Sequence, residues 1–154
     1  MSKIIVQKFG GTSVGSEERI AAVAKIVKEA SKNNSIVVVV SAMSGETNRL
    51  IKLAKSFGDN PSKREFDALV STGEKVSAAL LAMALQQIDV PAKSYTASQI
   101  SMRTTDSYSQ ARILDVDGKN IQETLEACIV PIITGFQGIT ESGDVTTLGR
   151  GGSD

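Results

Sequence analysis

The chain has 154 residues with 17 basic and 17 acidic side chains, and it is 41% hydrophobic but only 4% aromatic. This length suits one domain with a core of Ile, Val, Leu and Ala, and the balanced charge argues against a nucleic-acid partner. The longest wholly aliphatic run, residues 36–40, is too short to span a bilayer, and the N-terminus lacks a secretory signal. We therefore expect a cytoplasmic globular domain with no membrane partner.

Short β-rich runs alternate with longer helical patterns along the chain. The predicted strands are residues 3–9, 35–41, 92–96 and 129–134. The predicted helices lie within residues 16–34, 45–57, 62–88 and 117–127. The second and fourth strands are apolar nearly throughout, which is typical of strands covered on both faces. This alternation predicts an α/β fold in which helices cover both faces of a mainly parallel sheet.

Three local signals complete the predicted structure. Ser16 is a predicted N-cap of the first helix, because acidic residues and an apolar stripe follow it. Residues 135–149 form two short runs around "ESGD", which predicts a β-hairpin. Cys128, the only cysteine, has apolar neighbours, and we expect it to be buried and structural.

In open parallel α/β sheets, ligands bind at the carboxyl ends of the strands. The first such loop, "KFGGTSVGS", places Lys8 before Gly10 and Gly11. Glycine amides and the next helix could enclose an anion beneath the lysine charge, or the loop could be a tight turn with a surface lysine. The spacing excludes a Walker loop, in which the lysine follows the glycines.

The loop after the second strand, "SAMSGETN", contains the small hydroxyl residues Ser41 and Thr47. They could donate hydrogen bonds to a ligand at the strand end. Alternatively, they could serve only to cap the following helix.

The long helix carries an acidic residue beside its apolar face. On a helical wheel, Glu74 lies at the edge of the face formed by Phe66, Leu69, Val70, Gly73, Ser77, Leu80 and Ala84. A carboxylate in such surroundings needs a cation. Position alone leaves two partners open, a basic residue of the protein or the ammonium of a substrate.

The last loop, "GRGGSD", offers Arg150 as a planar fork for a carboxylate or phosphate, followed by Ser153 and Asp154. Together the loops fit a site for a zwitterionic small molecule beside a phosphate. The chain has no histidine, but phosphoryl transfer needs none, because positioning and charge neutralisation do most of the work.

Four motifs resemble the aspartate kinase family in order: "KFGGTSV" at 8–14, "VVSAMSGETN" at 39–48, "STGEKVSA" at 71–78 and "TTLGRGGSD" at 146–154. "ITGFQG" and "TTDSYSQARILDVD" fit the same pattern. The resemblance covers essentially the whole chain. It implies a three-layer α/β/α sandwich, the amino acid kinase fold, and transfer of phosphate from ATP with Mg²⁺ to the side-chain carboxylate of L-aspartate. The product, an acyl phosphate, leads to lysine, threonine and methionine.

The resemblance also implies roles for matching residues. Lys8 would neutralise charge on the transferring phosphoryl group, with the amides of Gly10 and Gly11 nearby, and Asp154 would orient Lys8 rather than abstract a proton. No residue is assigned as a protein ligand of a metal.

The substrate residues follow in the same way from the resemblance. Arg150 would bind the α-carboxylate of aspartate and Glu74 its α-ammonium. The remaining residues that would line the aspartate pocket are Ser41, Thr47, Phe136 and Ser153. One segment, residues 95–106, departs from the family, because Ala97 and Ser101 stand where members often have glycine.

In the family, "GRGGSD" continues into a helix, a nucleotide-binding lobe and regulatory ACT domains. We therefore expect residues 1–154 to be the N-terminal, aspartate-binding lobe, inactive alone, with an exposed sheet edge that favours homo-oligomers. The alternative is a non-catalytic assembly or binding module derived from such an enzyme. A sibling kinase for another substrate is disfavoured by the first-loop and arginine-loop motifs.

Overall fold

A computed structural model describes residues 3–149 of the chain, and its main sheet is entirely parallel. The sheet order is β1-β2-β6-β3, and these strands are β1 (Ile4–Phe9), β2 (Ser35–Val40), β6 (Val130–Thr134) and β3 (Ala92–Tyr95). All four predicted strands are confirmed to within two residues at each end. The two central strands, β2 and β6, are the apolar ones, because both of their faces are covered.

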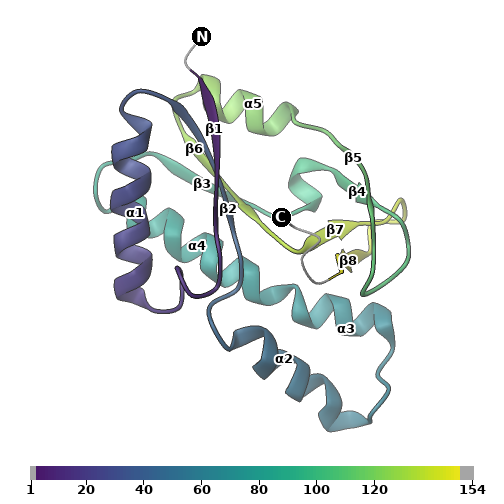
Figure 1. The fold of residues 1–154 in the computed structure, drawn as a ribbon. Helices are drawn as coiled ribbons and strands as arrows, with labels where there is room; N and C mark the ends of the chain where they lie inside the picture. Colours follow the sequence, from purple (N-terminus) through teal and green to yellow (C-terminus); the bar gives the residue numbers. More distant parts are fainter. Residues whose placement is uncertain (1–2, 150–154) are drawn as a thin grey trace.

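The helices are α1 (Glu17–Ser31), α2 (Glu46–Ala54), α3 (Lys63–Val70), α4 (Thr72–Gln86) and α5 (Lys119–Glu126), with 3₁₀ turns η1 (Lys55–Phe57) and η2 (Ser98–Ile100). The predicted long helix is divided at Ser71 into α3 and α4. Ser16 caps α1 as predicted, since its Oγ accepts a hydrogen bond from the Arg19 amide at 3.3 Å. In Figure 1, α2 and α3 extend beyond the carboxyl ends of the parallel strands.

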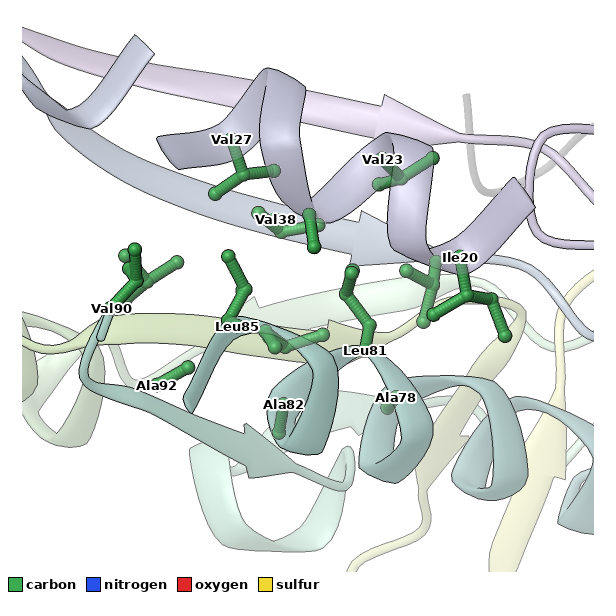
Figure 2. Packing of buried hydrophobic residues seen from close by; sticks show 14 of the residues in the cluster. Ile20, Val23, Val27, Val38, Ala78, Leu81, Ala82, Leu85, Val90 and Ala92 are labelled. Atoms are coloured by element: carbon green, nitrogen blue, oxygen red, sulfur yellow. The ribbon is translucent and has the colours of Figure 1, made fainter. Parts of the chain in front are cut away.

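The main core lies between α1, α4 and one face of the sheet. Figure 2 shows Val23 and Val27 of α1 and Leu85 of α4 gathered around Val38 of β2. Leu81 and Leu85 are fully buried, and the small side chains of α4 let it pack closely. By length and composition, the stretch Lys63–Gln86 is apolar enough to cross a membrane. Half of its most apolar window is buried inside this structure, so packing in the core explains the apolar content.

The opposite face of the sheet is covered by α5 and η2. Val37, Tyr95, Ile100 and Ile133 form this second, smaller core, against which Leu125 of α5 packs. Helices therefore cover both faces, and the predicted three-layer α/β/α architecture is confirmed (Figure 1).

A second sheet stands beside the first. Its order is β5-β4-β7-β8, with strands β4 (Met102–Thr104), β5 (Ile113–Val116), β7 (Gln137–Ile139) and β8 (Val145–Thr147). The hairpin β7–β8 confirms the prediction for residues 135–149. The strands β4 and β5 were not predicted, because they are only three and four residues long and every residue of β5 is exposed.

The prediction for Cys128 is wrong, because the side chain is exposed. Cys128 lies just beyond α5 with φ of 58°. Its amide donates to the Leu125 carbonyl and the Ile129 amide to the Thr124 carbonyl, both at 3.0 Å, which is the pattern that ends a helix with a left-handed residue. Most of the apolar residues that suggested burial, 130–133, belong to β6, whereas Cys128 belongs to the turn.

The segment that departs from the family contains one strained position. Ser101 has φ of 48°, in the left-handed region that favours glycine, whereas Ala97 is right-handed with φ of −55°. The absence of glycine therefore costs backbone strain at Ser101 but not at Ala97.

Candidate functional site

An open cavity of about 490 Å³ lies at the carboxyl ends of the parallel strands. Its walls come from the loops after β1, β2 and β6, from the start of α2, and from α3 and α4. This is the edge at which open parallel sheets bind ligands, as expected from the strand order.

Five of the residues proposed from the sequence meet in this cavity: Gly11, Ser41, Thr47, Glu74 and Phe136. Lys8 lies within β1 and Gly10 just after it, but neither is among the residues that line the cavity.

Three predicted site residues, Arg150, Ser153 and Asp154, lie outside the described residues. Their roles stay predictions.

Glu74 is the most unusual side chain in the cavity. It is only 2% exposed, and its Oε1 accepts a hydrogen bond from the Ala42 amide at 3.3 Å. Within residues 3–149, its other oxygen, Oε2, is buried and has no hydrogen-bond partner. Burial, which disfavours the charged form, raises the pKa of Glu74 to about 7, against the smaller opposing effect of backbone hydrogen bonds.

The helical-wheel assignment of Glu74 to the edge of the apolar face needs correction. Glu74 lies within the buried stripe of α4, close to Gly73, Ser77 and Ala78, whereas Leu80 is only partly buried. The difference arises because the loop after β2 packs against this part of the helix and covers it. A Cβ added at Gly73 would lie 2.8 Å from the Cβ of Ala42, so this contact requires glycine.

The loops after β1 and β2 are tied to each other. The Ser44 amide donates to the Gly11 carbonyl at 3.1 Å, and a Cβ at Gly11 would lie 2.8 Å from the Ala42 carbonyl oxygen. Gly11 is therefore needed for close packing of the two loops. At Gly10, by contrast, no atom of residues 3–149 lies within 4 Å of an added Cβ, so among these residues that side of the loop has room for a ligand.

Ser41 and Thr47 do not act as helix caps. The N-cap of α2 is Gly45, with φ of 83° and no side-chain cap, and Thr47 lies inside the helix. The Ser41 carbonyl accepts a hydrogen bond from Ser77 Oγ at 2.6 Å, which joins β2 to α4. Both side chains are thus part of the cavity wall, and the capping alternative is wrong.

Phe136 contributes to the cavity from a strained backbone. Its φ is 66°, which is unfavourable for an aromatic residue, and its carbonyl accepts a hydrogen bond from the Leu148 amide at 2.8 Å. Strain of this kind is often found at ligand sites.

The cavity residues that sequence reasoning missed include Ser109 and Thr147, together with the side chain that binds both. Ser109 and Thr147 line the cavity, and both donate hydrogen bonds to the fully buried Asp67 of α3. A signal for Asp67 was available, since it precedes Glu74 by seven residues and so falls on the same face of the helix predicted within residues 62–88.

The described residues offer little for direct binding of a metal. Among residues 3–149, no three Cys, Asp or Glu side chains form a cluster suited to a metal ion, and the chain has no histidine. Mg²⁺ commonly binds through phosphate oxygens and water with one or two carboxylates, so a nucleotide-bound ion would still suit this donor set. What the cavity itself provides is a carboxylate oxygen that has no partner in the described part of the chain and lies among small hydroxyl residues, which suits a small molecule with an ammonium group.

Comparison with known proteins places these features in a family. The model of the amino acid kinase family matches residues 3–154. An aspartate kinase of Stutzerimonas stutzeri is 57% identical over 152 residues, and an aspartokinase of Geobacillus stearothermophilus is 53% identical over 152 residues. The chain is covered to 98% in both alignments but spans only 37% of the length of these relatives.

Solved structures agree with this similarity. The crystal structure of E. coli aspartokinase III in complex with aspartate and ADP has a TM-score of 0.87 and 27% identity, covering 98% of this chain and 44% of that one. The aspartate kinase of Synechocystis has a TM-score of 0.80 and 47% identity, covering 99% of this chain and 25% of that one. The resemblance and the fold predicted from the motifs are therefore confirmed.

Proposed function

Because the chain belongs to the amino acid kinase family, we propose that it forms the aspartate-binding lobe of an aspartate kinase. Its similarity to curated aspartate kinases over 98% of its length supports this substrate. So does the cavity, since its size and its mixture of hydroxyl and carboxylate groups suit a small zwitterion.

The observation that carries the proposal is that Oε2 of Glu74 has no hydrogen-bond partner among residues 3–149. A carboxylate oxygen that is buried without a partner is unfavourable unless a ligand completes it. The α-ammonium of L-aspartate would supply both the charge and the hydrogen bonds. Ser41 and Thr47, which line the same cavity, would contact the remaining polar groups of the substrate.

The other roles proposed from the sequence extend this arrangement. Arg150 would bind the α-carboxylate, with Ser153 beside it in the pocket wall. Lys8, at the end of β1, would neutralise charge on the phosphoryl group, with the Gly10 amide nearby and Asp154 orienting the lysine. The attacking group is a carboxylate and has no proton to lose, so the residues are needed for positioning and charge rather than for base catalysis.

In the whole protein, ATP with Mg²⁺ would supply the phosphoryl group. The product would be 4-phospho-L-aspartate, formed in the cytoplasm for lysine, threonine and methionine synthesis. Since the chain spans 37% of the length of its relatives, we propose that it binds aspartate but does not complete the reaction alone. Trapping of the acyl phosphate with hydroxylamine by the 154-residue chain would overturn the second part of this proposal.

Calorimetric titration of the 154-residue chain tests the binding role. L-Aspartate should bind saturably, whereas succinate, which lacks the ammonium group, should bind at least roughly tenfold more weakly, as expected for loss of a charged hydrogen bond. Glu74→Gln should weaken the binding of L-aspartate but not the binding of succinate. Glu126→Gln, the same change at an exposed position of α5, is the matched control and should leave both ligands unaffected.

Arg150→Ala provides an independent check of the last loop. It should abolish binding of both dicarboxylates, because each presents a carboxylate to the arginine. Equal binding of L-aspartate and succinate by the unmodified chain would contradict the role proposed for Glu74.

A further inference from the structure

We propose that Asp67 is a positioning residue that holds two walls of the aspartate site in place. The proposal rests on the proposed function of the cavity. Asp67 is on α3, is 0% exposed and does not line the cavity, so it acts through the residues that it binds.

Four hydrogen bonds saturate the Asp67 carboxylate. The amides of Ser109 and Thr147 donate to Oδ2 at 2.7 and 2.8 Å. The hydroxyls of the same two residues donate to Oδ1 at 2.8 and 2.9 Å. Each partner is thus bound at both backbone and side chain, which fixes its position and its orientation.

The two partners come from segments that are otherwise far apart in sequence. Ser109 belongs to the connection between β4 and β5, and Thr147 is the last residue of β8. Both line the cavity that contains Glu74. One side chain therefore aligns two separate parts of the cavity wall with α3, and α3 is separated only by Ser71 from the helix that carries Glu74.

The backbone of Ser109 shows that this alignment is imposed. Its φ is 67°, in the left-handed region that is unfavourable for residues other than glycine. Such a conformation persists only where surrounding contacts hold it, and the two bonds to Asp67 provide them.

The bond to Thr147 extends the effect to another wall of the cavity. The Thr147 carbonyl accepts from the Ala111 amide at 3.0 Å, and the next residue, Leu148, donates to the carbonyl of the strained Phe136. Asp67 thereby fixes the end of β8.

The geometry predicts which substitution at Asp67 can be tolerated. In Asp67→Asn, the amide oxygen can take the place of Oδ2 and accept the two backbone amides, while its NH₂ group donates to the two hydroxyls, which can rotate to accept. Asp67→Ala leaves all four donors without their acceptor. Asp67→Asn should therefore keep the affinity for L-aspartate that Asp67→Ala loses.

The experiment uses the 154-residue chain and two measurements, calorimetric titration with L-aspartate and thermal unfolding. Asp67→Ala should bind L-aspartate at least roughly tenfold more weakly, and Asp67→Asn should stay within about threefold of the unmodified chain. Tyr95→Phe is the matched control, because it removes the buried hydroxyl pair with Thr124, 2.5 Å apart, which lies outside the cavity. It should lower the unfolding temperature without changing the affinity.

An Asp67→Ala protein that is folded and binds L-aspartate normally would overturn the proposal. The proposal would also be overturned if all three variants lost affinity in proportion to the decrease in their unfolding temperatures. If Asp67→Ala does not fold, the double variant Ser109→Ala with Thr147→Val replaces it, since it removes two donors and keeps the carboxylate. That double variant should bind L-aspartate several-fold more weakly, and normal binding by it would again overturn the proposal.

Amide hydrogen exchange separates this proposal from the proposed function. If the unmodified chain does not bind L-aspartate, the binding role fails, but the positioning role can still be measured at Ser109 and Thr147. Exchange at these two amides should accelerate selectively in Asp67→Ala and recover in Asp67→Asn. Unchanged exchange at both amides would overturn the positioning role.

Discussion

The Ala42 amide and the Glu74 carboxylate lie 3.3 Å apart and join the loop after β2 to α4. This single bond satisfies only one of the two carboxylate oxygens among the described residues. Because burial outweighs the hydrogen bond, the pKa of Glu74 rises to about 7, so the group titrates near neutral pH. The cavity thus contains a carboxyl group that a bound cation would favour in its ionised form. Its protonation therefore affects both the stability of the fold and the affinity for L-aspartate.

The stability of the chain should fall as pH rises through this range. The folded protein holds the Glu74 proton up to about pH 7, whereas the unfolded chain releases it near the ordinary value of 4.5. The contribution of Glu74 to the free energy of unfolding is therefore fully present below about pH 4.5, and it is lost progressively up to about pH 7. The loss should be at most roughly 3 kcal/mol.

Denaturant unfolding of the unmodified chain and Glu74→Gln from pH 4.5 to 8 measures this contribution. Glutamine cannot ionise, so the variant should gain stability relative to the unmodified chain as pH rises. Taking the difference between the two proteins removes the titration of other groups such as Asp144, whose pKa is lowered by Arg64. A difference that does not change with pH would show that Glu74 does not titrate in this range.

Affinity for L-aspartate should change with pH in the opposite direction. The substrate ammonium favours the ionised form of Glu74, so below pH 7 binding must displace a proton. We expect affinity to rise by up to about tenfold per pH unit from pH 5.5 to about 7 and then to level off. Titrations in buffers with different ionisation enthalpies should show proton release at pH 6 and almost none at pH 8.

Much of this arrangement follows from the sequence. The buried strands β2 and β6, the hairpin and the glycine loop come from local patterns, and five cavity residues follow from motifs at strand ends. The sequence does not show that Asp67 accepts hydrogen bonds from Ser109 and Thr147, because these partners lie 42 and 80 residues away. Only the second sheet brings them together, and its strands β4 and β5 give no periodic signal, because they are three and four residues long and every residue of β5 is exposed.

Cys128 shows the limit of composition as a guide to burial. Its neighbours in sequence are apolar, but burial depends on the direction of each side chain, and the left-handed turn after α5 directs this one to solvent. The same limitation applied to Glu74. The helical wheel gives the position of Glu74 around the helix axis, but the loop that covers it comes from a distant part of the chain.

The contact between Gly73 and Ala42 should be sensitive to one methyl group. Gly73→Ala would place two Cβ atoms 2.8 Å apart, which overpacks the joint beside Glu74. We expect a loss of about 1–2 kcal/mol in unfolding free energy, although alanine favours helices. Gly118→Ala, where no atom of residues 3–149 lies within 4 Å of the added Cβ, should show no loss from overpacking and only the small cost of alanine at the N-cap of α5.

A compensating change tests the cause of that loss. Ala42→Gly removes the opposing Cβ, so Ala42→Gly combined with Gly73→Ala should recover most of the stability lost by Gly73→Ala alone. The measurement is a double-mutant cycle by denaturant unfolding. Strictly additive effects would show that the two positions do not meet as described.

Cys128→Gly should stabilise the chain. The left-handed conformation at φ of 58° strains a cysteine but suits glycine, which is the residue most common at this position after a helix. After allowing for the greater flexibility of glycine in the unfolded chain, we expect a gain of about 0.5–1 kcal/mol. Ala127→Gly, at the preceding position with φ of −79°, is the control and should destabilise.

The exposed edge of the main sheet should drive self-association. Within residues 3–149, β1 pairs only with β2, and its Ile4 and Val6 side chains are 60% and 63% exposed. An apolar edge strand is a template for pairing with another copy, and a further charge placed among its apolar side chains disfavours that pairing. Light scattering should therefore show a mass that increases with concentration for the unmodified chain and a monomer for Val6→Lys. Val76→Lys adds the same charge at a 46% exposed position of α4 and should still associate, whereas a monomeric unmodified chain at all concentrations would contradict the role of β1.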